Sequence, residues 1–477
     1  MDGAVGAGAR PALAADARPA SVRPRSGVPT RAWRAPLAVV CGLVMVAAAV
    51  EIVLDASLLH SPLAPKSPRI AAWMASLGGE RLGYRTFLIA IFAFAVAYGV
   101  LIWLARRPLA PGAEGEGAVR PREGALALAG GERRRFRWAL ALVLALELIV
   151  FVGPILISTD VFSYIAYARM GVVHGINPYL HGPDAISGDP VFRYVGQDWL
   201  KVETAYGPLY TLLSYPLGLL GVVGALWGMK VYALLASLGT LALTWQVARR
   251  LALDPVFALL AVGANPLYVI YGLGGAHNDL IMLALMTGAV ALTLADRDAL
   301  AGAAVVAGAL VKATVAVLLP FMVLARRRSA AVYGALAALA LGALVAYLAF
   351  GVHGVNIVSA LNRDSAFVST DSFPTELAHL AGKPGVFPAD HDLLKAALVL
   401  IVLHLLWRTW RGYDWVAASG WALLAISVTS TWLLAWYILW PLPLAVMTRD
   451  RRLLWATLFV QALFLVHQTS PLFAPVQ

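Results

Sequence analysis

The residues in this sequence that could do chemistry are ionisable side chains beside long apolar runs. Asp160 follows one such run, and the trio His277, Asn278 and Asp279 opens another. A charge beside a membrane is costly unless it is paired or hydrated, so such groups are candidates for function. A carboxylate at the water boundary of a protein-lined cavity has a raised pKa and suits a general base. Asp160 is therefore the candidate catalytic base, and a simple helix-end cap is the alternative.

Lys312 stands inside the apolar run 299–324 with no acidic residue within one helical turn. We expect an unpaired lysine that either reaches an interface or faces a lipid phosphate. The trio at 277–279 has a structural alternative too, because Asn278 or Asp279 could cap the following helix. Capping explains one polar residue, and three in a row favour a functional role.

Residues 158–205 form a polar, aromatic segment in which acidic residues outnumber basic ones. Aromatic faces stack on sugar rings and guanidinium groups suit phosphate, so the tyrosines and Arg169 of this segment are candidate contacts of a sugar or a phosphate. Interfacial aromatic belts explain the tyrosines equally well, and Glu203 could be a structural partner of Lys201 or Arg193. Candidate binding residues lie in this segment, at Tyr206 directly after it, and in the aromatic stretch 431–441. They are Tyr164, Arg169, Asn177, Tyr179, Lys201, Glu203, Tyr206, Trp436 and Tyr437.

The elements that position these residues are predicted to be membrane helices. Of 477 residues, 60% are hydrophobic and 13% are charged, which excludes an ordinary soluble enzyme. The formal net charge is +11, but basic residues cluster beside apolar runs, so they indicate membrane orientation and not nucleic-acid binding. Cys41 is the single cysteine, which excludes an intrachain disulfide.

The pattern predicts an all-α, polytopic bundle of about 13 spans in a bacterial plasma membrane. Basic clusters place residues 105–137 and the segments near Arg326, Arg408 and Arg449 in the cytoplasm. Segments 158–205 and 351–392 then lie outside as two large loops. The predicted spans are 36–54, 84–104, 138–157, 206–226, 229–248, 254–274, 280–295, 299–324, 329–350, 393–407, 415–430, 431–447 and 453–470.

Two stretches leave the topology open. His277 shares a side with Asp160 only if the chain crosses an even number of times between residues 206 and 277. Run 299–324 is either one tilted helix or a half-depth hairpin around Lys312. The expected organisation is a disordered cytoplasmic tail at 1–34, two spans with a basic loop at 35–137, a catalytic module at 138–350, an outer loop at 351–392 and carboxy-terminal spans at 393–477.

Together the motifs resemble the GT-C superfamily of membrane glycosyltransferases, which use polyprenyl-phosphate sugars. They are most similar to actinobacterial polyprenyl-phosphomannose-dependent α-1,6-mannosyltransferases. The resemblance covers about residues 140–445, and its motifs lie in the family's order. The matching stretches are 158–164 with 175–179, 206–210, 275–279, 312 and 436–437.

The resemblance implies a GT-C fold with Asp160 as the base of an inverting transfer. Mannose would move from polyprenyl-phosphate-mannose to a glycan or lipoglycan acceptor at an extracytoplasmic site. Thr159 stands where the family has a basic residue beside this aspartate. Donor phosphate contacts would therefore fall to Arg169, Lys201 or Lys312.

Other readings stay open. The sugar could be arabinose or another pentose, since pocket shape decides selectivity. A lipid or solute transporter is the alternative from a different class, with Lys312, Asp279 and Glu203 along its path. The acidic residues of the first outer loop could bind a divalent cation or none, so no metal ligand is assigned. The expected partners are a polyprenyl-phosphate-sugar donor, a glycan acceptor and the lipid bilayer.

Overall fold

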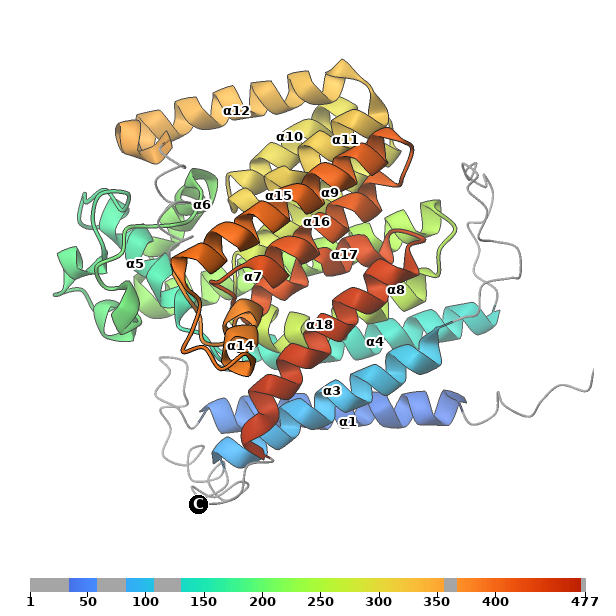
Figure 1. Cartoon of the computed structure of the whole chain (residues 1–477). Helices are drawn as coiled ribbons and strands as arrows, with labels where there is room; N and C mark the ends of the chain where they lie inside the picture. The colour runs from blue at the N-terminus through green and yellow to red at the C-terminus, as the bar shows by residue number, and fades with distance from the viewer. Residues whose placement is uncertain (1–33, 58–82, 107–129, 356–366, 473–477) are drawn as a thin grey trace, which may run out of the picture.

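The computed structural model describes residues 34–57, 83–106, 130–355 and 367–472, and these residues form helices and connecting turns without a strand (Figure 1). The predicted tail at 1–34 lies, but for its last residue, outside the described residues. So do the greater part of the basic loop and residues 356–366 of the second outer loop. An all-α architecture is thereby confirmed for the described part of the chain.

The helices of the amino-terminal half include several short 3₁₀ turns and one π-helix, η4. They are α1 (Arg34–Ser57), α3 (Gly83–Ala105), α4 (Gly130–Val152), α5 (Asp160–Val172), η1 (Pro183–Ile186), η2 (Phe192–Tyr194), η3 (Gln197–Trp199), α6 (Pro208–Gly218), α7 (Gly221–Arg250), α8 (Pro255–Gly263) and η4 (Leu267–Leu273).

The carboxy-terminal half alternates long apolar helices with short broken ones. Its elements are α9 (Asp279–Leu294), α10 (Asp298–Ala309), η5 (Ala313–Val317), α11 (Leu318–Arg326), α12 (Ser329–Phe350), η6 (Gly351–Val355), α14 (Phe373–Leu380), α15 (Pro388–Trp410), α16 (Trp415–Thr429), η7 (Ala435–Leu439), α17 (Pro441–Val446), α18 (Arg451–Thr469) and η8 (Ser470–Leu472).

Five helices in the described part are long and apolar enough to cross a membrane, namely α1, α3, α7, α12 and α15. A sixth span results if α8 and η4, which meet at a bend of 49°, are taken together. Other apolar helices are too short to cross alone, α9 and α16 among them. The chain is therefore a multi-helix membrane protein, and the figure of about 13 spans stays a prediction.

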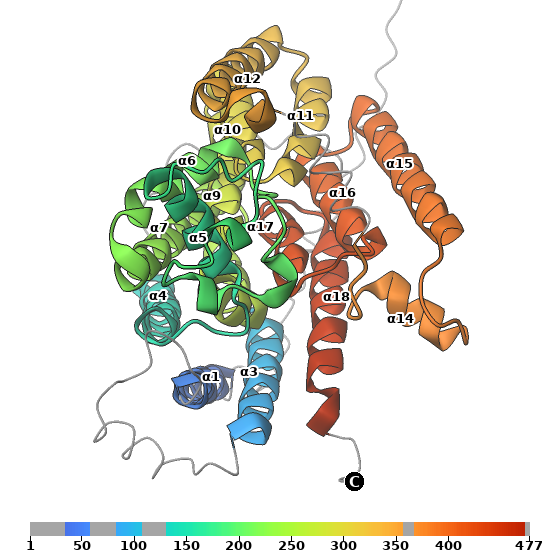
Figure 2. The same ribbon diagram turned by 90° about the vertical axis from the view of Figure 1, so that its left-hand side faces the viewer.

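The helices lie side by side, with α5 and α6 gathered at one end of the bundle (Figure 1). Close packing depends on small residues, as in other membrane bundles. A Cβ on Gly302 of α10 would lie 2.0 Å from the Ala331 carbonyl oxygen, and one on Gly334 of α12 would lie 1.9 Å from that of Ala299. In the view turned by 90°, α15 lies at the outside of the bundle with α14 below it (Figure 2).

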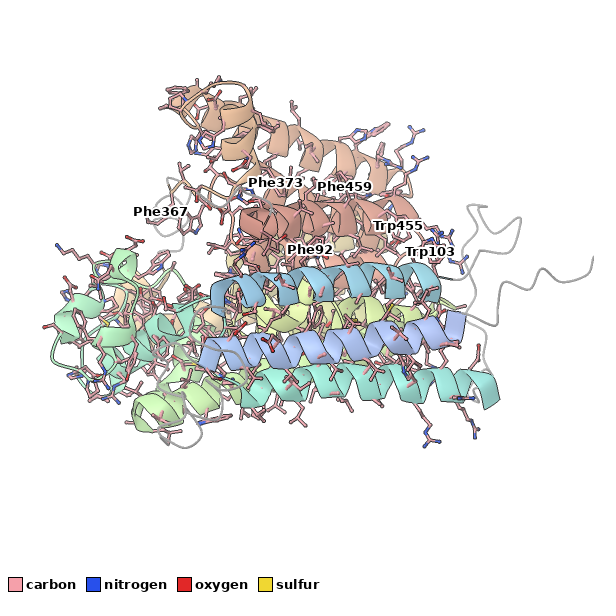
Figure 3. The ribbon with its side chains drawn as sticks, turned by 90° about the horizontal axis from the view of Figure 1, so that it is seen from below. Phe92, Trp103, Phe367, Phe373, Trp455 and Phe459 are labelled. Carbon is pink, nitrogen blue, oxygen red and sulfur yellow. The ribbon has the colours of Figure 1, made fainter. Side chains whose placement is uncertain are left out.

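Helices α3 and α18 face the surroundings with large aromatic side chains. Phe92 on α3 and Trp455 and Phe459 on α18 are all exposed (Figure 3). A cavity of about 240 Å³ lies between these two helices. Within it, the Asn265 amide donates hydrogen bonds to the Tyr98 hydroxyl and to Gln461 Oε1. Apolar aromatic surface on these helices fits a lipid environment.

The structure corrects the predicted runs on both sides of the first outer loop. Run 138–157 is wrong at its end, because α4 stops at Val152, where the Lys230 ammonium donates to the carbonyl oxygens of Val150 and Gly153. Asp160 consequently opens α5 and does not end a span. Run 206–226 is also wrong. It contains the short helix α6, with Pro208 in its first turn, and then the start of the 30-residue α7.

The stretch between residues 206 and 277 contains one helix long enough to cross, α7, and the bent pair α8 and η4. Helix α6 has 11 residues and packs on α5. Helix α7 runs to Arg249 and Arg250, and α8 with η4 leads back to His277, which fits the even number of crossings that was expected. His277 and Asp160 lie in contact as a result, with 3.8 Å between Nδ1 and Oδ2.

The run around Lys312 is a hairpin, not one tilted helix. Helix α10 ends at Ala309, and Lys312 is extended, with φ −149° and ψ 120°. η5 and α11 then lead back, so that Arg326 Nε lies 3.0 Å from Asp298 Oδ1 at the start of α10. At 1.5 Å per residue the 12-residue α10 reaches only about 18 Å, roughly half the thickness of a bilayer. We call residues 298–326 the half-depth hairpin.

Candidate active site

Four segments that are distant in sequence meet at the end of the bundle where α5 lies. They are the start of α5, the turn between η4 and α9, the tip of the half-depth hairpin, and η7. Each is a break in helical structure, where backbone and side-chain polar groups remain available. Irregular backbone of this kind occurs inside membrane proteins where it is buried or lines a cavity.

Asp160 lies beside a buried imidazole. His277 Nδ1 is 3.8 Å from Asp160 Oδ2 and 3.3 Å from the Tyr164 hydroxyl. The imidazole stacks on the Trp436 ring, with ring centroids 3.6 Å apart. Burial, and then the charge of Lys312, lower the pKa of His277, so the ring is neutral at pH 7.

Lys312 is paired, and the expectation of an unpaired lysine is wrong. Its ammonium donates to both carboxylate oxygens of Asp279, each at 2.9 Å. The Trp440 indole also donates to Asp279, at 2.6 Å. The Lys312 ammonium lies 4.3 Å from the ring centre of Tyr437 and 5.3 Å from that of Trp440. The sequence concealed this pair because 33 residues separate the partners.

Of the ionisable side chains in this cluster, those of Asp160 and Lys312 are partly exposed to solvent. Their side chains are 13% and 16% exposed, whereas those of Asp279 and His277 are 0% exposed. Burial raises the pKa of Asp160 to about 6, against the charge of Lys312 and a hydrogen bond with Ser158, which lower it. A carboxyl group with a pKa in this range can accept or release a proton near neutral pH.

Several buried polar atoms of this cluster have no partner within the described chain. They are His277 Nε2, both amide atoms of Asn278 and the Ser163 hydroxyl. Asn278 precedes α9 but makes no capping hydrogen bond, and Asp279 is committed to Lys312 and Trp440, so the capping interpretation of the trio is wrong. Asp160 likewise lies in the first turn of α5, whose N-cap is Thr159. Unsatisfied buried polar groups are rare, and a bound ligand or water is the usual explanation.

Three predicted binding residues of the outer loop hold the loop together. Arg169 pairs with the buried Asp189 at 2.8 Å and donates to the Gly218 carbonyl at 3.0 Å. The Asn177 amide donates to the Phe350 carbonyl. The Tyr179 hydroxyl donates to the carbonyl of residue 206 at 2.8 Å. A direct role for Arg169 at a donor phosphate is therefore unsupported.

The remaining predicted residues differ in their surroundings. Lys201 is exposed and Glu203 is half-buried on the outer loop. The Tyr206 ring lies 4.7 Å from that of Tyr164, so it belongs to the wall of the cluster. Trp436 and Tyr437 lie on η7 against His277 and Lys312.

Trp440 and Tyr210 belong to the cluster and were not among the predicted residues. Trp440 lies in the aromatic stretch 431–441, one turn after Trp436, and that spacing could have identified it. The Tyr210 ring lies 5.1 Å from that of Tyr164. In the described ranges no three His, Cys, Asp or Glu side chains are grouped so that they could hold a metal ion.

The amino-acid sequence matches two family models of transferases. Residues 204–475 match the model of glycosyltransferase family 87. Residues 39–328 match the model described as "Alpha-(1->6)-mannopyranosyltransferase, N-terminal domain", and because this is more than half of the chain, the protein belongs to that family.

Individual relatives agree with this assignment. The chain is 28% identical over 331 residues to alpha-(1->6)-mannopyranosyltransferase A of Mycobacterium tuberculosis, which covers 62% of the chain and 63% of the relative. It is 32% identical over 179 residues to the Corynebacterium glutamicum protein of that name, 37% of the chain and 36% of the relative. Alpha-(1->6)-mannopyranosyltransferase B of C. glutamicum is 23% identical over 344 residues, 62% and 57% of the two chains. The chain thus spans less than two thirds of these relatives.

Proposed function

We propose that this protein is a membrane mannosyltransferase that moves mannose from polyprenyl-phosphate-mannose to a glycan or lipoglycan acceptor. The observation that carries the proposal is the presence of two partly exposed charged groups, Asp160 and Lys312, in one cluster. A transfer from a lipid phosphate needs a base for the acceptor hydroxyl and a cation for the leaving phosphate. The names of the relatives support mannose as the sugar.

In the proposed reaction Asp160 takes the proton of the acceptor hydroxyl as the acceptor oxygen attacks the anomeric carbon. The bond from that carbon to the phosphate oxygen breaks, and the phosphate leaves with the electron pair. Attack from the face opposite the phosphate inverts the anomeric configuration. A base with a pKa of about 6 is largely ionised at pH 7 and can still accept a proton efficiently.

Lys312 is the proposed contact of the leaving phosphate. Of the three cations considered, Arg169 is committed to Asp189 and Lys201 is exposed on the loop. Lys312 is held in one place by Asp279 and by two aromatic rings, and its side chain keeps 16% of its surface. A fixed cation costs no reorganisation when charge develops on the phosphate.

The site is proposed to face the outside of a bacterial plasma membrane. Basic side chains gather at the opposite end of the bundle, where Arg135 pairs with Asp254 and Arg326 with Asp298. Positive residues favour the cytoplasmic side, so the end with Asp160 would be outside. A lipid-linked donor fits this location because soluble nucleotide sugars are cytoplasmic.

A pentosyl donor, polyprenyl-phosphate-arabinose, is the second candidate within the same chemistry. A transporter is the candidate from another class, and the match to two transferase family models favours the enzyme. Among the groups suggested for a transport path, Lys312 and Asp279 neutralise each other at 2.9 Å, which leaves Lys312 less free to carry an ion.

The test uses membranes that contain the protein, radiolabelled polyprenyl-phosphomannose and an α-mannoside acceptor. The Asp160→Asn variant keeps the shape of the side chain and removes the base, so it should fold and lose transfer. Asp184→Asn is the matched control, because Asp184 is an exposed carboxylate on the same outer loop. Full transfer by Asp160→Asn would refute the assignment of the base. Transfer with the arabinose donor alone would change the sugar.

A further inference from the structure

The tip of the half-depth hairpin is held by backbone hydrogen bonds from a distant segment. The N–H of Gly207 donates to the Val311 carbonyl at 3.1 Å, and the N–H of Leu209 donates to the Leu310 carbonyl at 3.1 Å. Both acceptors directly precede Lys312. Residues 207–209 therefore fix the two peptide units from which the lysine extends.

The close approach depends on a residue without a side chain at position 207. A Cβ built on Gly207 would lie 2.0 Å from the Leu310 carbonyl oxygen and 2.4 Å from its carbonyl carbon. Those atoms belong to the backbone, so no side-chain rotation relieves the clash. Any larger residue must push the tip of the hairpin away.

The segment 206–209 is itself anchored to the outer loop. The Tyr179 hydroxyl donates to the carbonyl of Tyr206 at 2.8 Å and lies 3.1 Å from the Thr211 hydroxyl. Asn177 Oδ1 accepts from the N–H of Tyr179, and its amide donates to the Phe350 carbonyl at the end of α12. The outer loop is thus connected to Lys312 through a series of hydrogen bonds.

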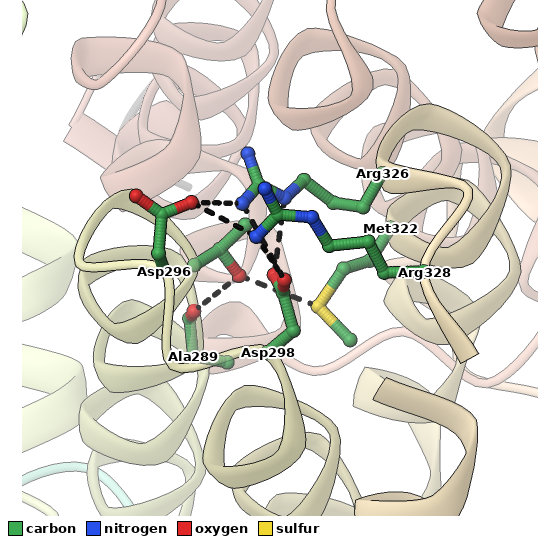
Figure 4. A network of polar contacts seen from close by, with 7 residues as sticks. Ala289, Asp296, Asp298, Met322, Arg326 and Arg328 are labelled. Atoms are coloured by element: carbon green, nitrogen blue, oxygen red, sulfur yellow. Dashed lines mark hydrogen bonds and ion pairs between the residues drawn. The ribbon is translucent and has the colours of Figure 1, made fainter. Parts of the chain in front are cut away.

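The base of the same hairpin is held by charges (Figure 4). Asp298 at the start of α10 accepts from Arg326 at 3.0 Å and from Arg328 at 2.9 Å. Asp296 adds ion pairs to the same two arginines. With its base fixed in this way, a displacement of the tip changes the position of Lys312 and not the whole hairpin.

We propose that Gly207 is a positioning residue for Lys312, and that Tyr179 acts through it. The absence of a side chain at 207 lets the backbone of 207–209 hold the hairpin tip, which places the ammonium group beside Asp279 and Tyr437. This proposal relies on the proposed function only for the role of Lys312 at the leaving phosphate.

The first experiment is a double-mutant cycle in the transfer assay with the full-length protein in membranes. Gly207→Ala should lower kcat about a hundredfold, the effect of a displacement near 1 Å, with a smaller change in the KM for the donor. In a Lys312→Gln background the same change should have little further effect, because the group that it positions is already gone. Gly188→Ala is the control, since a Cβ there meets nothing within 4 Å.

A second measurement does not depend on enzymatic activity. Ala313→Cys, in a protein whose buried native Cys41 is replaced by Ala, reports on the exposure of the hairpin tip to a maleimide. Gly207→Ala should raise the rate of modification severalfold, and Gly188→Ala should leave it unchanged. If Gly207→Ala fails to fold, Tyr179→Phe takes its place, since it removes the hydroxyl and keeps the ring.

The outcomes separate the two proposals. An unchanged rate of modification, or multiplicative effects of Gly207→Ala and Lys312→Gln on kcat, would overturn the positioning role. If Gly207→Ala raises the rate of modification but the wild-type protein transfers neither mannose nor arabinose, the hairpin contact is supported and the proposed function is overturned.

Discussion

Two substitutions in the ion pair between Lys312 and Asp279 can distinguish its contribution to stability from its contribution to catalysis. Lys312→Met removes both hydrogen bonds of 2.9 Å. Among the described residues it leaves the Trp440 indole as the side-chain donor to a carboxylate that is 0% exposed. Removing one partner of a buried pair costs about 3–5 kcal/mol, because a charge stays buried without compensation. We expect Lys312→Met to lower the free energy of unfolding by about that amount.

Adding Asp279→Leu to this variant should restore most of the lost stability. Replacing both charges by apolar side chains is often neutral or stabilising, so we expect the double variant within about 1–2 kcal/mol of the wild type. Transfer should not recover. Loss of a fixed charged donor at a developing oxyanion lowers kcat by about 10²–10³, and the double variant still lacks it.

Thermal unfolding in detergent, followed by tryptophan fluorescence, measures the stability, and the radiolabel assay measures transfer. Asp254→Ala, at the opposite end of the bundle, controls for non-specific destabilisation. A double variant that is stable and transfers mannose at the wild-type rate would refute the role of Lys312 at the phosphate. The same double variant without recovered stability would refute the account of the ion pair.

Three further predictions concern single residues. Transfer should fall as the pH drops below about 6, because the proposed base Asp160 becomes protonated there, and a pH profile of kcat/KM checks this. Asp189→Asn should lower the free energy of unfolding by roughly 3 kcal/mol, because it breaks the buried pair with Arg169. Burial raises the pKa of Asp189, but the hydrogen bond from Arg169 lowers it to about 2. This stabilisation is present above the unfolded pKa and is lost only as the pH falls through about 2, and unfolding measured against pH checks it. Asp254→Ala should cost about 1 kcal/mol or more, because its side chain caps α8 and also pairs with Arg135, and thermal unfolding measures the loss without an expected change in transfer.

Much of the fold follows from the sequence because hydrophobic runs and basic clusters are local signals. Runs 36–54, 84–104 and 329–350 correspond closely to α1, α3 and α12. Run 206–226 failed, since α6 and the start of α7 are equally apolar and hydropathy does not detect the break at Leu219 and Leu220. Run 254–274 corresponds to α8 and η4, which qualify as one span only when taken together across their bend of 49°.

For the candidate site too, the sequence predicts some features and not others. Asp160, His277, Asp279, Lys312, Trp436 and Tyr437 could be selected from the sequence, since ionisable or clustered aromatic residues beside apolar runs are conspicuous by type and position. Their contacts could not be predicted, because a pair such as Lys312 with Asp279 depends on which helix ends meet. Arg169 shows the converse, since its apparent suitability for phosphate disappears once Asp189 lies 2.8 Å away.

The sequence alone thus determined a helical membrane protein with ionisable groups at the ends of its apolar runs. Composition and periodicity are properties of residues that are neighbours in sequence, so they can be evaluated without knowledge of the fold. Only the tertiary structure decided that residues 298–326 turn back at half depth, that Lys312 is paired, and that Gly207 contacts the Leu310 backbone. Each of these depends on distances between segments far apart in the chain, which only packing determines.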